Sequence, residues 1–350
     1  MTKIVLTRFP LESDFGGEEK IIALLSAHFP MIFWTNCKTL KKILPPKKVF
    51  PAFFVRDITA KKTLFFSPIF AIFLIFQSFF FFPFFRFSGA RKIIFHTFLE
   101  KIFLTPIAKF FGFEVFWAHH APLGKWFFRH PFLIFWKIFS RFSTILVPTH
   151  FLKNELLKGK KNLKIVVVEN PAENFFGAKI RGKNFVVGAA GRLAPEKHFE
   201  KIIKIAEKLP EIDFKIAGDG AEKNILQKIA PKNVEFLGFL AGEKYRNFWR
   251  KIDVFVSFSD RETFGIVAAE AARAGVPAIV VRAGGFLEIV KNGETGFFVA
   301  DENDAIAKIK CLKNDEKLRQ KMQKKAKKWG EKFSEKNFLK KMEKILGKSF

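Results

Sequence analysis

Two carboxylates and one glycine stand close together in the stretch from Asp253 to Pro277. Glu262 precedes Gly265, and Glu270 lies eight positions after Glu262. Carboxylates bind phosphate poorly but accept hydrogen bonds from sugar hydroxyls, so this pair suits one hexose and one ribose. Eight positions correspond to about 80° around a helix axis, so both side chains can border one cleft if both are helical. Alternatively, Glu270 is an ordinary solvated helix residue, because Glu is a common helix former.

The local sequence predicts a strand, a polar loop and a helix around these carboxylates. Residues 254–256 form an apolar run typical of a buried strand, residues 257–262 are polar, and residues 266–274 are rich in Ala. The start of such a helix exposes unpaired N–H groups and the positive end of the helix dipole. Gly265 would let a phosphate approach the backbone closely, so the stretch predicts an anion-binding turn.

A second loop, after the apolar run 185–190, carries Arg192 and Lys197. Arg offers a planar fork of donors and Lys a point charge, which together suit a diphosphate. Taken alone, two such cations also fit an ordinary solvated loop. Strands and helices then alternate to residue 299, which predicts parallel sheets covered on both faces by helices.

The stretch from Asp253 to Pro277 resembles the donor-site signature of the retaining glycosyltransferases of family four. The matching residues are Ser259, Glu262, Phe264, Gly265, Glu270, Ala271, Gly275 and Pro277. The resemblance covers about residues 185–330 well and the first half of the chain loosely. It implies the α/β GT-B fold, in which two Rossmann-like domains with parallel sheets face each other across a cleft. Residues 1–172 would form the acceptor-side domain, residues 173–330 the donor-binding domain, and residues 331–350 a helix crossing back to the first domain.

The resemblance also assigns roles. It implies a metal-independent, retaining hexosyltransferase, whose donor-site residues would be Arg192, Lys197, Glu262, Thr263, Phe264, Gly265, Ile266 and Glu270. Glu262 would hold the hydroxyls of the transferred sugar, and Glu270 would accept a hydrogen bond from the ribose. One departure from the family pattern is His198, which follows Lys197 where the family usually has Gly.

The first half of the chain contributes two further candidates. The family pattern Gly-Gly-x-Glu matches Gly16, Gly17 and Glu19, which predicts a loop for the acceptor or a phosphate at the start of a helix. His120 follows the predicted strand 114–117, where α/β proteins bind ligands. In the family a His in this loop approaches the transferred sugar, so His120 joins Glu262 as a candidate catalytic residue. A structural hydrogen-bonding role is the alternative for His120.

Neither a metal nor a cofactor is expected. The sequence contains no Asp-x-Asp, which argues against a metal-bridged diphosphate. Its two cysteines, Cys37 and Cys311, lie far apart and without metal-ligand spacing, so neither a zinc site nor a disulfide framework is predicted. The cysteine usage and the short apolar core of the N-terminus fit a cytoplasmic protein.

The distribution of charge along the chain indicates which partners it could bind. The net charge is +28, and residues 38–150 contain 17 Lys and Arg against three acidic residues, together with 28 of the 50 Phe. Cations interleaved with large apolar side chains suit an anionic membrane surface, which predicts a peripheral protein on the inner face of the plasma membrane. A membrane-proximal or lipid-linked glycan would then be the acceptor. The alternatives are compositional drift toward A/T-rich codons, a catalytically silent membrane scaffold that binds sugar nucleotides, and a nucleic-acid-binding protein. No nucleic acid partner is expected, because no such binding motif is present.

One segment is long enough to raise the question of a membrane span. Residues 64–85 contain no charged residue. Pro68 and Pro83 are expected to confine the helix to about residues 69–82, and 14 residues at about 1.5 Å each cover only about 21 Å of a bilayer core of about 30 Å. We therefore expect this helix either to be buried or to lie in the membrane interface.

Overall fold

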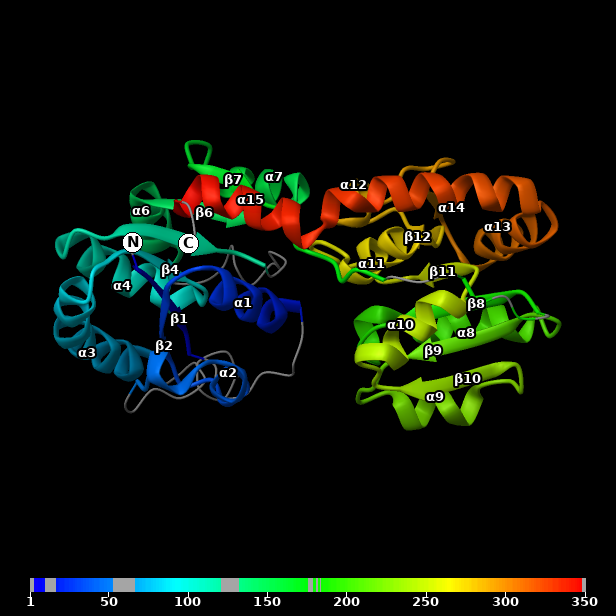
Figure 1. Ribbon diagram of the computed structural model, residues 1–350, viewed down its shortest axis with the longest axis horizontal. Coiled ribbons are helices and arrows are strands. Elements are labelled where there is room, and N and C mark those ends of the chain that lie inside the picture. Colours follow the sequence, from blue (N-terminus) through cyan, green and yellow to red (C-terminus); the bar gives the residue numbers. More distant parts are fainter. Residues whose placement is uncertain are drawn as a thin grey trace. The chain divides into compact units, whose positions relative to one another are not determined.

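The chain folds into two compact units, each built on a parallel sheet with helices on both faces (Figure 1). The computed structural model describes residues 3–9, 17–52, 67–120, 132–175, 179, 180, 182 and 184–347, and describes side chains of the helix that begins at Ser67 from Ala71 onward. Unit 1 comprises residues 1–168 and 339–350, and unit 2 comprises residues 169–338.

The sheet of unit 1 has seven parallel strands in the order β3-β2-β1-β4-β5-β6-β7. Its central strands are buried on both faces, which explains why they read as continuous apolar runs instead of alternating ones. The strands are β1 (Lys3–Arg8), β2 (Met31–Thr35), β3 (Val49–Phe50), β4 (Ala90–Phe95), β5 (Glu114–Ala118), β6 (Ser143–Val147) and β7 (Ile165–Val167).

The helices of unit 1 cover both faces of this sheet. They are α1 (Gly17–His28), α2 (Lys38–Ile43), α3 (Ser67–Phe87), α4 (Phe98–Phe110), α6 (Leu133–Phe139), α7 (His150–Gly159) and most of α15 (Glu335–Leu346). The side chain of Thr149 caps α7 by accepting from the backbone N–H of Leu152. In α15, Glu343 contacts His28 of α1 at 2.9 Å, and the carbonyl of Ile345 accepts from Lys92 of β4.

The long apolar helix α3 differs from the expectation. It continues to Phe87, with Pro83 inside it, although Pro83 was expected to end it near residue 82. An internal Pro removes one helical hydrogen bond, but Phe82 and Phe85 on either side of it are buried in the core of unit 1. Both rings pack on Trp34 of β2. Tertiary packing therefore outweighs the local preference of Pro to end the helix. Within the described residues, no helix is long and apolar enough to cross a membrane.

The sheet of unit 2 has six parallel strands in the order β10-β9-β8-β11-β12-β13. The strands are β8 (Val186–Ala190), β9 (Asp213–Ala217), β10 (Val234–Gly238), β11 (Val254–Ser257), β12 (Ala278–Val281) and β13 (Gly296–Val299). The helices are α8 (Phe199–Glu207), α9 (Lys223–Ile229), α10 (Gly242–Lys251), α11 (Ile266–Ala274), α12 (Phe286–Ile289), α13 (Glu302–Asn314) and α14 (Glu316–Gly330).

The strand order of unit 2 reverses between β8 and β11. From β8 the chain builds β9 and β10 on one side, and then returns to place β11, β12 and β13 on the other. Loops after the two strands at such a reversal turn away from each other and leave a crevice at the carboxyl edge of the sheet, where open α/β sheets bind ligands. In unit 2 these are the loops that follow Ala190 and Ser257.

Candidate active site

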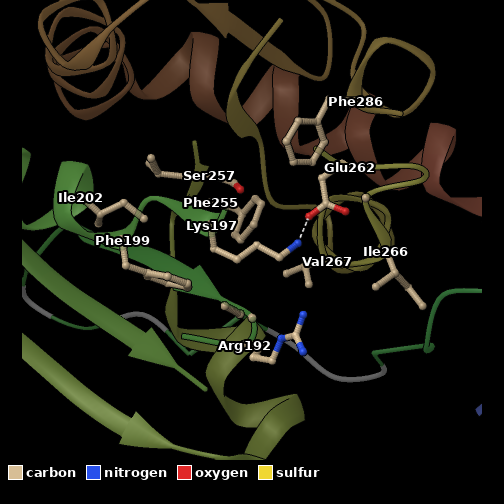
Figure 2. Close-up of a pocket in the computed structure, with 14 residues that line it drawn as sticks. Arg192, Lys197, Phe199, Ile202, Phe255, Ser257, Glu262, Ile266, Val267 and Phe286 are labelled. Atoms are coloured by element: carbon tan, nitrogen blue, oxygen red, sulfur yellow. Dashed lines mark hydrogen bonds and ion pairs between the residues drawn. The ribbon is translucent and has the colours of Figure 1, made fainter. Parts of the chain in front are cut away.

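A pocket of about 210 Å³ opens where the strand order of unit 2 reverses (Figure 2). Its walls are the loop after β8, the end of β11 with the loop that follows, and the first turn of α11. The lining residues are Ala190, Gly191, Arg192, Lys197, Phe199, Ile202, Phe255, Val256, Ser257, Glu262, Gly265, Ile266, Val267 and Phe286. The fold thus brings the two loops singled out in the sequence, some 70 residues apart, into one site.

The start of α11 forms one wall of the pocket. Gly265 is its N-cap residue and has a φ of 87°, in the left-handed region that suits Gly. A Cβ on Gly265 would lie 2.8 Å from ring carbons of Phe286, so the space is also closed to a larger residue. Gly265, Ile266 and Val267 all line the pocket, which places the positive end of the helix dipole there. This geometry fits the predicted anion-binding turn.

Lys197 and Glu262 form an ion pair inside the pocket, drawn as the dashed line in Figure 2. Their side chains are 25% and 19% exposed, so the pair is partly shielded from water. Arg192 extends from the same loop as Lys197, and its Nη2 contacts Oε1 of Glu196 at 3.0 Å. Both predicted cations therefore have carboxylate partners, with which an incoming diphosphate would compete.

His198, the residue that departs from the family pattern, adopts the conformation that a Gly would take. Its φ of 53° and ψ of 45° lie in the left-handed region, between the 3-10 helix Pro195–Lys197 and α8. The left-handed conformation costs a non-Gly residue roughly 1 kcal/mol. The His198 ring contacts Glu200 at 3.1 Å and Asp260 at 3.6 Å. The backbone turn after Lys197 is therefore kept without glycine, at a local cost in strain.

Two contacts fix the loop that carries Glu262. Ser259 is fully buried, and its hydroxyl donates to the backbone carbonyl of Glu196 at 3.4 Å, which links this loop to the loop of Lys197. The backbone N–H of Gly285 donates to the carbonyl of Glu262 at 2.8 Å. A Cβ on Gly284 would lie 2.1 Å from that carbonyl oxygen, so this close approach needs glycine.

The remaining predicted donor residues lie beside the pocket and are not part of its lining. Phe264 is buried, with its ring 5.8 Å from that of Phe333, and Thr263 precedes it in the loop. Glu270 is 3% exposed and accepts a hydrogen bond of 2.6 Å from the hydroxyl of Tyr245 on α10. Burial, followed by the charge of Glu270, raises the pKa of Tyr245 well above its ordinary value. Glu270 is thus not a solvated helix residue.

Several pocket residues were not singled out by the sequence. Ser257 ends β11 and places a hydroxyl in the pocket, and Phe286 covers the pocket from α12 (Figure 2). Phe199 and Ile202 close it from the side of α8. A Ser at the carboxyl end of a predicted central strand was a usable signal for Ser257. The apolar residues gave none, because they read as ordinary core positions.

Unit 1 carries a second polar cluster, at the carboxyl ends of β1, β4 and β5. Gly17 begins α1, whereas Gly16 lies outside the described residues. Glu18, the next residue, pairs with Arg8 and contacts Nδ1 of His96 at 2.7 Å. The ring of His120 stacks on that of His96, with centroids 6.0 Å apart. The predicted residues Gly17 and His120 thus lie at one edge of the sheet, together with Arg8 and His96, which the sequence did not suggest.

Burial sets the protonation states of this cluster. Desolvation lowers the pKa of His120 to about 4, and it lowers the pKa of His119 well below its ordinary value, so both rings are neutral at pH 7. Burial also lowers the pKa of Lys101 to about 8. For Glu18, burial opposes ionisation, but the hydrogen bond and charge of His96 and the charge of Arg8 outweigh it and hold the pKa far below its usual range.

Glu18, His96 and His120 also have the composition of a metal site. Their candidate ligand atoms lie within 4.8 Å of one another. The planes of the two imidazole rings lie at an angle of 17° to each other. Arg8 also already compensates the charge of Glu18. The expected absence of a metal therefore stays a prediction for this cluster.

Comparison with known proteins agrees with this geometry. Residues 171–329 match the family profile of glycosyl transferases group 1. Over 136 residues the chain is 35% identical to the sulfoquinovosyl transferase SQD2 of Arabidopsis thaliana, in an alignment that covers 37% of this chain and 27% of the relative. Over 114 residues it is 38% identical to a GDP-mannose-dependent alpha-mannosyltransferase of Mycolicibacterium smegmatis. This alignment covers 33% of this chain and 30% of the relative. The chain therefore spans less than a third of the length of these curated relatives.

Solved structures extend the likeness to the whole chain. Anabaena HepE in complex with UDP superimposes with a TM-score of 0.78 at 17% identity, over 99% of both chains. The same protein in complex with UDP-glucose gives a TM-score of 0.76. The fold expected from the sequence is thus confirmed, and residues 171–329 match a glycosyl transferase profile as the resemblance implies. The chain has the GT-B fold and carries a glycosyl transferases group 1 domain at residues 171–329.

Proposed function

We propose that the chain is a retaining glycosyltransferase that moves a hexose from a nucleotide diphosphate sugar to a membrane-proximal or lipid-linked glycan. The observation that carries the proposal is the pocket of unit 2, which joins two cations, a helix N-terminus and the carboxylate of Glu262 at the point where the strand order reverses. A diphosphate needs the positive groups, and a sugar needs the carboxylate.

The diphosphate of the donor would lie between Arg192, Lys197 and the first turn of α11. These groups stabilise the charge that develops on the leaving nucleoside diphosphate, so a metal ion is not required. Lys197 then exchanges its contact with Glu262 for a contact with phosphate. The exchange leaves Glu262 available to accept hydrogen bonds from hydroxyls of the transferred hexose. The two partners of this ion pair would thus serve the two halves of the donor, Lys197 the diphosphate and Glu262 the hexose.

Transfer would proceed with attack and departure on the same face of the sugar. The bond from the anomeric carbon to the phosphate oxygen breaks, the acceptor oxygen bonds to that carbon, and the leaving phosphate takes the acceptor proton. No enzyme nucleophile takes part. His120 has a neutral ring at pH 7 and suits a hydrogen bond to a sugar hydroxyl in this scheme. Glu270 would turn from Tyr245 toward the ribose.

Similar proteins support a nucleotide sugar as the donor. HepE is solved with UDP and with UDP-glucose, and the mycobacterial relative is named as GDP-mannose-dependent. These names differ in nucleobase, so the donor of this chain has to be found by comparing UDP, GDP and ADP sugars. The proposed setting is the inner face of the plasma membrane, where the chain would be peripheral and would meet its acceptor.

A transfer assay tests the proposal. The full chain is incubated with UDP-, GDP- and ADP-hexoses and with vesicles of bacterial lipid extract, with and without EDTA, and the anomeric configuration of the product is read by NMR. We expect one donor to be consumed, a product of unchanged anomeric configuration, and no effect of EDTA. Glu262→Gln should abolish transfer, whereas Glu294→Gln, an exposed control in the same unit, should not. Nucleotide binding without turnover would instead indicate a silent scaffold.

A further inference from the structure

Helix α3 exposes an apolar face along most of its length. Phe76 is 77% exposed and Phe87 is 94% exposed. The residues of this face, called here the α3 face, are Ile72, Phe73, Phe76, Phe79, Phe80, Phe84 and Phe87. At 100° per residue all seven lie within an arc of about 140°, and from first to last they cover about 22 Å of the helix axis.

The opposite side of α3 already fills the core of unit 1. Leu74, Phe81, Phe82 and Phe85 are buried and pack with β2 and α4. A surface helix of a water-soluble domain normally carries polar residues opposite its buried stripe, and a helix that is apolar all round is buried or lies in a membrane. The packing of unit 1 therefore does not account for the α3 face. An exposed apolar patch of this kind marks an interaction site.

Basic side chains border the α3 face at its C-terminal end. Arg86 lies in the last turn of α3, Arg91 is the second residue of β4, and Lys109 lies in the last turn of α4. Lys109 precedes Phe110, which is 79% exposed and whose neighbour Phe111 packs against Phe79. The only acidic residue between positions 67 and 113 is Glu100, which is fully buried. Just beyond this range Glu114, which is half exposed, pairs with Lys92 at 3.3 Å, so the surface beside the exposed rings is predominantly cationic.

The same combination continues on helix α6. This helix packs against α4, which in turn packs against α3, so the three helices form one layer (Figure 1). Exposed apolar residues of α6 and the short turn after it are Ile134, Phe135, Ile138 and Phe142. Lys137 and Arg141 stand among them, and no acidic residue occurs from Phe132 to Asn154. Aromatic rings beside cations thus recur across the layer.

We propose that the α3 face is the surface through which this chain binds an anionic lipid bilayer, with α3 lying in the headgroup boundary parallel to the membrane plane. Exposed Phe rings enter the acyl boundary, and Arg86, Arg91 and Lys109 contact lipid phosphates. A second copy of the chain fits less well, because it would place these cations against their own counterparts. The proposal adds a partner to the proposed function. It rests on that function only for the reason that the chain binds a membrane, which is to reach its acceptor.

Vesicle flotation of the full chain, without donor or acceptor, tests this surface. The parent is compared on vesicles of pure phosphatidylcholine and on vesicles with 30 mol% phosphatidylglycerol. Phe76→Ser with Phe80→Ser removes two rings of the α3 face, and Phe239→Ser removes an exposed ring of unit 2 as the matched control. Arg91→Glu with Lys109→Glu reverses two border charges, with Lys324→Glu and Lys328→Glu as the control on α14. Thermal unfolding checks that each variant folds.

We expect the parent to float with anionic vesicles. The variant that lacks the two Phe rings (the Phe pair) should bind both kinds of vesicle at least about tenfold more weakly. The variant with the two reversed charges should lose the preference for phosphatidylglycerol. Both controls should bind as the parent does. No flotation of the parent, or equal flotation of the Phe pair, would overturn the proposal. So would a lipid-free dimer of the parent that the Phe pair abolishes, since it would identify a second copy as the occupant. Each outcome leaves the nucleotide-sugar proposal standing, because nucleotide binding is measured separately.

Discussion

The ion pair between Lys197 and Glu262 predicts that two substitutions in one pocket change nucleotide binding in opposite directions. A nucleoside diphosphate without sugar needs Lys197 but has no use for Glu262, which occupies the lysine and repels phosphate. Glu262→Gln should therefore tighten the binding of the nucleoside diphosphate. Lys197→Gln should weaken it.

The magnitudes follow from the exposure of the pair. Both side chains are about one-fifth to one-quarter exposed, so breaking the pair costs roughly 0.2–1 kcal/mol, and Glu262→Gln should lower the Kd about 1.5- to 5-fold. A charge-assisted hydrogen bond to phosphate contributes about 1.5–3 kcal/mol, so Lys197→Gln should raise the Kd about 10- to 100-fold. In the double variant the part of the gain that comes from releasing the lysine should disappear, and only the loss of the repulsion between Glu262 and phosphate should remain.

Isothermal titration calorimetry at constant ionic strength, with UDP, GDP and ADP, measures these differences. Titration with the nucleotide sugar completes the comparison, because Glu262→Gln should weaken its binding relative to the diphosphate by removing an acceptor for hexose hydroxyls. If Glu262→Gln weakened the binding of the bare diphosphate, the assignment of Lys197 to the phosphates and Glu262 to the sugar would be refuted.

Three further predictions concern stability and are checked by urea unfolding. Gly265→Ala should cost about 1–3 kcal/mol more than Gly293→Ala, because both residues have positive φ but only the first Cβ meets Phe286; equal costs would argue against the clash. His198→Ala should be about 1 kcal/mol less stable than His198→Gly, which suits the left-handed turn; the reverse order would show that the strain is absent. As pH falls from about 6.5 toward 4, the unfolded chain takes up a proton at position 120 that the folded chain resists, so stability present above pH 6.5 should fall by up to about 1.4 kcal/mol per pH unit. His120→Gln should reduce that slope and leave the contribution of His119, and an unchanged slope would mean that the ring of His120 is not desolvated.

Much of the fold is predictable from the sequence, because strands buried on both faces appear as apolar runs. Residues 254–256 were expected as a buried strand, and they lie in β11 (Val254–Ser257). The predictions fail where tertiary packing decides. Pro83 does not end α3, since the rings around it are held by the core. Helix α10 was not expected, because its sequence is largely polar and only Phe248 and Trp249 are buried.

The donor pocket was predictable to a similar degree, and for a physical reason. A glycine before a helix and cations after a strand are local signals, so Gly265, Arg192 and Lys197 could be found. Side-chain contacts between residues that lie far apart in the sequence could not be predicted. The partner of Glu270 is Tyr245, on the helix that the sequence did not predict, and the contact between Glu18 and His96 joins residues 78 positions apart.

The proposed function depends above all on the pocket of unit 2 binding the diphosphate of a nucleotide sugar. A crystal structure of the chain with the nucleoside diphosphate that calorimetry selects tests it most directly. We expect the diphosphate to lie at the first turn of α11, within hydrogen-bond distance of Arg192 and Lys197, and Lys197 to have left Glu262. A nucleotide bound elsewhere, or bound here with the Lys197–Glu262 pair intact, would contradict it.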